Sequence, residues 1–105
     1  EGRRYLSRKT VEYMLSNHSA GMGGNTLANT GPGYGFGLGF AVRLEQGMGW
    51  VPGSIGDAMW AGIWGTSFWI DPRENFTALI MTQGPTSKTH SRMLYKTLVY
   101  GALMK

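Results

Sequence analysis

The stretch over 33–40 reads GYGFGLGF, with glycine at every second position and an aromatic or aliphatic residue in between. This pattern strongly constrains the fold, because it fits either a strand with one bare face or a glycine loop around a phosphate. No register of the stretch matches G-x-G-x-x-G, and the chain has no Gly-Lys pair for a G-x-x-x-x-G-K-[ST] loop. The phosphate interpretation is therefore rejected, and no nucleotide cofactor is expected.

The alternation continues to position 45. Large side chains share one face: Tyr34, Phe36, Leu38, Phe40, Val42 and Leu44. Small or charged residues share the other: Gly35, Gly37, Gly39, Ala41, Arg43 and Glu45. Period-two alternation predicts a half-buried strand over 34–45, with another backbone or a ligand close to its glycine face.

Helices are predicted at both ends of the chain. The first spans 7–18, with Ser7 as its N-cap and His18 as a packing or capping residue rather than a ligand. The last spans 88–104, with an apolar face made of Leu94, Leu98, Val99, Ala102 and Leu103. A glycine- and asparagine-rich loop is predicted over 19–33.

The middle of the chain predicts a hairpin. The apolar segments 66–70 and 76–82 are joined by DPREN at 71–75, a turn in which Pro72 presets its own φ and Asp71 bonds back to the backbone. We therefore expect an α+β fold, with an antiparallel sheet of about three to five strands between an N-terminal and a C-terminal helix.

Composition excludes several classes. The chain has 105 residues, enough for one small domain or a piece of a larger one, and its start without methionine is typical of a fragment. It has no cysteine for a thiolate metal site, no apolar run near the roughly 18 residues of a membrane span, and no targeting segment. The net charge of +4 gathers at the two ends, which is more typical of solvated helix faces than of a nucleic-acid surface.

A complete catalytic set is absent from the sequence. The segment Gly65-Thr66-Ser67-Phe68-Trp69 misses G-x-S-x-G, no serine begins S-x-x-K, and no tyrosine begins Tyr-x-Asn. The histidines are His18 and His90, and no pair of carboxylates is placed for acid–base work. The chain alone is expected to be inactive, with no metal and no cofactor.

Several segments together resemble the C-terminal part of the serine β-lactamase-like superfamily. They are YLSRKTVEYM, GYGFGLGFAVR, PGSIGDAMWAGIWGTSFWIDPRENFTALIMTQ and the terminal helix. The likeness is greatest to class C β-lactamases, family VIII esterases and D-alanyl-D-alanine peptidases. It implies that residues 1–105 are a single segment of a serine hydrolase whose S-x-x-K and Tyr-x-Asn motifs lie earlier in the protein.

The resemblance also implies a site. The family's active-site strand carries Lys-Thr-Gly in lactamases and tryptophan-small-glycine in esterases, and Trp60-Ala61-Gly62 stands at that place here. The missing lysine favours an esterase-like hydrolase. Trp60, Ala61 and Gly62 would then form a substrate wall, and the Ile63 backbone N–H would be an oxyanion donor. The alternative is that Trp60, Trp64 and Trp69 are only core aromatics.

Two functional hypotheses remain. The first is a hydrolase segment that acts on a small acyl ester, a peptide or a β-lactam, with the missing N-terminal segment or a second copy as its protein partner. The second is a non-catalytic binding or assembly module that reuses the same fold. The compartment is left open by the sequence.

Overall fold

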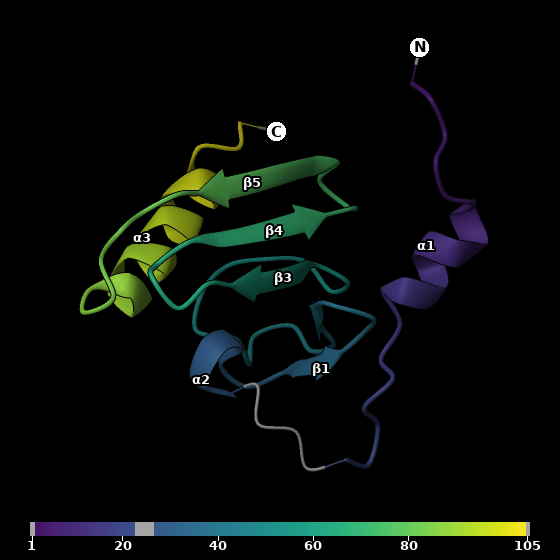
Figure 1. Cartoon of the computed structure of the whole chain (residues 1–105), viewed down its shortest axis with the longest axis horizontal. Coiled ribbons are helices and arrows are strands. Elements are labelled where there is room, and N and C mark those ends of the chain that lie inside the picture. Colours follow the sequence, from purple (N-terminus) through teal and green to yellow (C-terminus); the bar gives the residue numbers. More distant parts are fainter. Residues whose placement is uncertain (1, 23–26, 105) are drawn as a thin grey trace.

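The computed structural model describes residues 2–22 and 27–104 and has an α+β fold (Figure 1). Five antiparallel strands form one sheet in chain order: β1 (Tyr34–Phe36), β2 (Ala41–Arg43), β3 (Ala58–Ala61), β4 (Ser67–Asp71) and β5 (Phe76–Ile80). The described helices are α1 (Arg8–Met14), α2 (Leu27–Thr30) and α3 (Lys88–Gly101). The predicted fold class is confirmed, since helices near the two ends of the chain flank an antiparallel sheet.

The single strand predicted over 34–45 is wrong. The chain reverses over 37–40, and β1 and β2 pair as a hairpin with Phe36 opposite Ala41. The N–H of Gly37 donates to the carbonyl of Phe40 at 2.7 Å, and Gly39 has a φ of +93° that favours glycine. This register also divides the predicted faces, because Phe36 lies opposite Ala41 and Gly35 lies opposite Val42, so the large residues of β1 share a face with small or charged residues of β2.

The bare glycine face has the close neighbour that the sequence predicted. A Cβ on Gly35 would overlap the side chain of Asn17, and one on Gly37 would overlap the backbone carbonyl of Met14. The segment that follows α1 is bonded to the same place, because the Leu38 N–H donates to the Met14 carbonyl at 2.9 Å. The glycines therefore let the backbone after α1 approach the β1–β2 hairpin.

The first helix is shorter than predicted. Ser7 is its N-cap, with Oγ accepting from the Thr10 N–H at 3.1 Å, but α1 ends at Met14 rather than at residue 18. The N–H of His18 instead donates to the Phe36 carbonyl at 2.7 Å, which draws the chain out of the helix. The His18 ring nitrogen Nε2 lies 2.7 Å from the Tyr13 carbonyl oxygen, which agrees with the predicted capping role.

The loop predicted over 19–33 is interrupted by the one-turn helix α2. Residues 23–26 of that predicted loop lie outside the described residues.

The predicted hairpin is confirmed. β4 pairs with β5 from Ser67 opposite Ile80 to Asp71 opposite Phe76. In the connecting turn, Asp71 Oδ1 accepts from the backbone N–H groups of Arg73 at 3.0 Å and Glu74 at 3.1 Å. This is the side-chain-to-backbone bond expected of aspartate at the start of a turn.

The core lies between the sheet and α3. Trp69 of β4 is 2% exposed and packs with Ala41, Met59 and Ala78 of the neighbouring strands. Aromatic rings of α3 complete the packing, with the Tyr95 and Tyr100 centroids 5.5 and 6.1 Å from that of Trp69. Figure 1 shows α3 lying beside β4 and β5, with α1 at the other side of the molecule.

The apolar face predicted for the last helix is partly wrong. Leu94 and Leu98 are 48% and 62% exposed, and the helix ends at Gly101 rather than at residue 104. Val99 does pack against the core, but it does so beside the two tyrosines rather than beside the leucines. The helix is rotated because Trp69 offers a flat aromatic surface to Tyr95 and Tyr100, and because Lys96 has a buried acidic partner.

That partner is Asp57, which belongs to a buried polar cluster. Asp57 Oδ2 accepts from Arg43 Nε at 2.9 Å and from Lys96 Nζ at 3.1 Å, and Oδ1 accepts from the Tyr34 hydroxyl at 3.0 Å. Burial lowers the pKa of Lys96, while the neighbouring Asp57 charge opposes that change. Burial, reinforced by Asp57, raises the pKa of Tyr34 well above its ordinary value. Lys96 is thus buried and does not belong to the solvated helix face that the sequence predicted for the basic residues near this end.

Candidate functional site

The four residues implied as a site stand together where β3 ends. Trp60 and Ala61 are the last residues of β3, and Gly62 and Ile63 begin the turn that leads to β4. The turn closes through two backbone bonds, from Gly62 N–H to the Thr66 carbonyl at 2.8 Å and from Gly65 N–H to the Gly62 carbonyl at 3.2 Å. Ile63 therefore lies in a β-turn, as its second residue, and not on the strand itself.

A hollow of about 350 Å³ opens beside this turn. Its lining combines the end of β3 with β4 and the end of β5: Trp60, Ala61, Gly62, Thr66, Ser67, Phe68, Leu79 and Met81. Three of the four predicted residues thus share one hollow, and Ile63 lies next to it in the turn, 72% exposed.

The tryptophans separate into different roles. Trp69 is buried in the core, as predicted, whereas Trp64 is 57% exposed and is not a core residue. Trp60 is half-buried, and its ring meets Phe36 edge-on with centroids 5.3 Å apart. The Trp60 side chain therefore packs against Phe36 and also lines the hollow.

Gly62 has a structural reason to be glycine. A Cβ at this position would overlap the hydroxyl oxygen of Thr66, across the turn. A substitution of Gly62 would therefore move Thr66 as well as crowd the hollow. This makes Gly62 a poor position for separating an effect on a substrate from an effect on the turn.

Two basic side chains of α3 donate hydrogen bonds to backbone carbonyls of this turn. The Arg92 guanidinium donates through Nη2 to the Gly62 carbonyl and to the Thr66 carbonyl, the latter at 3.2 Å. The Lys88 ammonium donates to the Ile63 carbonyl at 3.2 Å. Burial lowers the pKa of Arg92, but a guanidinium stays charged at neutral pH.

These two residues were not identified from the sequence, although a signal was present. Lys88, Arg92 and Lys96 recur at every fourth position, which puts all three on one face of a helix. Such a stripe is usually solvated, but here Lys96 is buried and Arg92 is half-buried. The missing information was the position of carbonyl and carboxylate acceptors on the sheet.

The Ile63 N–H is free to donate. Within residues 2–22 and 27–104, the structure gives this N–H no hydrogen-bond partner, whereas the N–H groups of Gly62 and Gly65 are both used in the turn. An N–H without a hydrogen-bond partner, on an exposed residue beside a hollow, is a feature that a substrate oxygen can use.

Ser67 and His90 do not pair as a nucleophile and a base in this structure. Ser67 is buried and its hydroxyl lies 3.4 Å from the Trp60 carbonyl, while His90 is exposed on α3. No group of three histidine, cysteine, aspartate or glutamate side chains in the described part of the chain could hold a metal ion. Among the described helices, none has the length and apolar character needed to cross a membrane.

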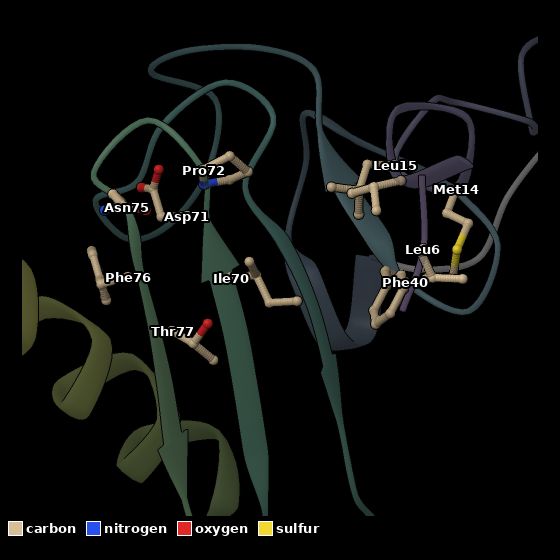
Figure 2. A pocket seen from close by; sticks show the side chains of 11 residues that line it. Leu6, Met14, Leu15, Phe40, Ile70, Asp71, Pro72, Asn75, Phe76 and Thr77 are labelled. Carbon is tan, nitrogen blue, oxygen red and sulfur yellow. The ribbon is translucent and has the colours of Figure 1, made fainter. Parts of the chain in front are cut away.

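A second, apolar hollow of about 540 Å³ lies between α1 and the ends of β4 and β5. Figure 2 shows Leu6, Met14, Leu15 and Phe40 on one side of it and Ile70, Pro72 and Thr77 on the other. Its charged lining residue is Asp71, whose carboxylate also accepts from the Tyr100 hydroxyl at 2.6 Å. We call this second hollow the apolar groove, because its lining is mostly hydrocarbon side chains.

Comparisons with known proteins find a likeness to a solved hydrolase structure. No family model matches the chain, and no curated protein matches it. Among solved structures, the chain is similar to EstCE1, described as a hydrolase with promiscuous acyltransferase activity, with 26% sequence identity and a TM-score of 0.80. The match covers 95% of this chain and 26% of that one, so the chain spans about a quarter of the length of the structure it resembles. The chain therefore shares the fold of part of a hydrolase.

Proposed function

We propose that this chain is the C-terminal part of a serine hydrolase, esterase-like or β-lactamase-like, and that the end of β3 forms one wall of its acyl site. The observation that carries the proposal is the arrangement of Trp60, Ala61 and Gly62 around one hollow, next to the unpartnered N–H of Ile63. The likeness to part of an acyl-transferring hydrolase supports the same reading.

In this proposal the Ile63 N–H donates to the oxygen that becomes negative when an acyl group is attacked. A fixed backbone donor of this kind lowers the barrier by about 3 kcal/mol in serine hydrolases. Trp60 forms the apolar wall, and the absence of a side chain on Gly62 leaves room for the acyl group. The substrate class is a small acyl ester, with peptides and β-lactams as further candidates. The ester is favoured because position 60 is tryptophan, whereas the lactamase motif has lysine at the corresponding place.

The nucleophile must come from outside these 105 residues, because S-x-x-K and Tyr-x-Asn are absent from them. We propose that the rest of the fold covers the apolar groove between α1 and the sheet. The groove exposes hydrocarbon, and the chain matches only 26% of the neighbouring structure. A non-catalytic assembly module is the alternative function, favoured by the same lack of a nucleophile.

The first test separates these two functions by chemistry. The complete product of the gene that encodes this chain is incubated with p-nitrophenyl butyrate and with a fluorescent fluorophosphonate, beside the 105-residue chain and a heat-treated sample. We expect turnover and a covalent label on the complete product and neither on the chain alone. An unlabelled, inactive complete product would support the assembly module instead.

The second test isolates the backbone donor. Ile63 is the second residue of its β-turn, a position where proline is favoured, so Ile63→Pro removes the N–H with little change in the turn. In the complete product we expect Ile63→Pro to lower kcat by roughly 10²–10³-fold with KM little changed. Ile63→Ala keeps the N–H and should lose much less. Equal losses in the two variants would remove the N–H from the mechanism.

A further inference from the structure

The peptide group that joins Gly62 to Ile63 contains both the proposed donor and an atom held by α3. Its oxygen is the Gly62 carbonyl that accepts from Arg92, and its hydrogen is the Ile63 N–H. The described residues contain no cis peptide bond, and in a trans peptide the C=O and N–H point to opposite sides. Arg92 therefore directs the Ile63 N–H away from α3.

The following peptide is held in the same way. Lys88 donates to the Ile63 carbonyl at 3.2 Å, so cations of one helix bind the carbonyls on both sides of the Ile63 α-carbon. Arg92 also binds the Thr66 carbonyl at 3.2 Å, on the opposite leg of the turn. The peptide groups before and after Ile63 are thus both held in orientation by side chains of α3, as a preorganised donor requires.

The charge of Arg92 is not neutralised locally. The ion pairs of the described residues use Asp57 for Arg43 and Lys96, and Glu12 for Arg8 and Lys9, and none includes Arg92. The Arg92 Nε is buried without a hydrogen-bond partner. A cation whose partners are neutral carbonyls polarises those peptides, and in a low dielectric this strengthens the N–H at the other end of each one.

We propose that Arg92 is a positioning residue that orients and polarises the Gly62–Ile63 peptide, so that the Ile63 N–H is a directed and strengthened donor toward the hollow. Lys88 assists by holding the next peptide. The catalytic consequence rests on the proposed function of the site, whereas the effect on the peptide itself does not.

The effect on the peptide is measured by NMR on the ¹⁵N-labelled 105-residue chain. The variants are Arg92→Met, which removes the charge, and Arg92→Lys, which keeps it. The matched control is Arg73→Met, which removes an exposed arginine from the turn after β4. Amide resonances of β3 and β4 and a thermal melt show whether each variant remains folded.

We expect Arg92→Met to move the Ile63 amide proton and nitrogen upfield, because electron density returns to the amide when its carbonyl loses the cation. Arg92→Lys should restore part of the shift, and Arg73→Met should leave the Ile63 resonance in place. An Ile63 resonance that is the same in folded Arg92→Met and in the wild type would overturn the proposal. If Arg92→Met does not fold, Arg92→Lys is compared with the wild type instead. Its Ile63 resonance should then lie between the wild-type and random-coil positions, and an unchanged resonance would overturn the proposal.

The catalytic consequence is measured separately on the complete gene product with p-nitrophenyl butyrate. Arg92→Met should lower kcat by roughly tenfold with KM little changed, less than the loss expected for removal of the donor itself. Arg92→Lys should recover part of that loss. A resonance shift without any loss of kcat would leave the polarised peptide in place and count against the proposed function. An unshifted resonance would count against the role of Arg92 whatever the activity.

Discussion

Lys96 of α3 and Asp57, the residue before β3, lie 39 positions apart in the sequence, and their ammonium nitrogen and carboxylate oxygen are 3.1 Å apart. Arg43 donates to the same oxygen at 2.9 Å. All three residues are buried. This cluster joins α3 to the sheet. The same helix carries Lys88 and Arg92, which bind backbone carbonyls of the turn at the candidate site.

Removal of the Asp57 charge should therefore be costly. Asp57→Asn leaves two buried cations without their counter-ion, and we expect a loss of about 3–5 kcal/mol in the free energy of unfolding. Urea unfolding followed by tryptophan fluorescence measures the loss. Glu45→Gln removes an exposed carboxylate and is the control. A loss no larger than that of the control would show that the cluster does not hold the helix.

Asp71 predicts a dependence of stability on pH. Burial alone would raise the pKa of this carboxyl, but hydrogen bonds from Tyr100, Ser54 and the turn backbone lower it below its ordinary value of 3.8. The folded state therefore binds the Asp71 proton more weakly than the unfolded chain does. Its contribution to stability is complete above about pH 5 and disappears as the pH falls through the lowered pKa.

The corresponding variant is Asp71→Asn. We expect it to be less stable than the wild type at pH 7, and the difference should shrink steadily below about pH 4. Unfolding free energies at pH 7, 5, 4 and 3 measure this difference. A gap between the two proteins that stays constant over the whole range would show that the hydrogen bonds do not favour the charged carboxylate.

The bare face of Gly37 predicts a local effect. Gly37→Ala places a methyl group against the Met14 backbone carbonyl, which cannot move without separating the chain after α1 from the hairpin. We expect a loss of about 1–3 kcal/mol and faster proteolysis before residue 33. Gly101→Ala, in open space at the end of α3, should be neutral or slightly stabilising. Equal stability of the two variants would contradict the close approach.

Local turn chemistry explains which parts of the fold the sequence predicted well. The β4–β5 hairpin was predictable because Asp71 and Pro72 specify the turn within a few residues. The strand over 34–45 was not, because the alternation of glycine with large residues continues through the connection at 37–40 and does not show that the chain reverses there. Only the pairing of Phe36 with Ala41 distinguishes them.

The face of α3 depended on distant residues. A hydropathy pattern ranks Leu94 and Leu98 above Tyr95 and Lys96, yet the structure buries Lys96 and exposes the leucines. Trp69 and Asp57 decide this orientation, and neither is near α3 in the sequence. The candidate site was predictable only through a family resemblance. Its supporting cations Lys88 and Arg92 required knowledge of where the β3–β4 turn meets the helix.

Exposed apolar surface predicts that the 105-residue chain associates with itself. Leu79 and Met81, at or after the edge strand β5, are 57% and 73% exposed, and the groove beside α1 is apolar. Light scattering over a concentration series should show dimers or larger species. Leu79→Lys should shift the chain toward monomer. A monomer at every concentration would show that the exposed surface does not need a partner.

The most direct test of the central claim is the hydrogen exchange of the Ile63 amide in the complete gene product, before and after it reacts with a fluorophosphonate. Under the proposed function, the phosphoryl oxygen of the labelled serine would occupy the place of the oxyanion. We predict that exchange at Ile63 then slows by roughly tenfold or more, because its free N–H gains an acceptor. A labelled protein in which the Ile63 amide exchanges as fast as before would contradict the assignment of this turn to the acyl site.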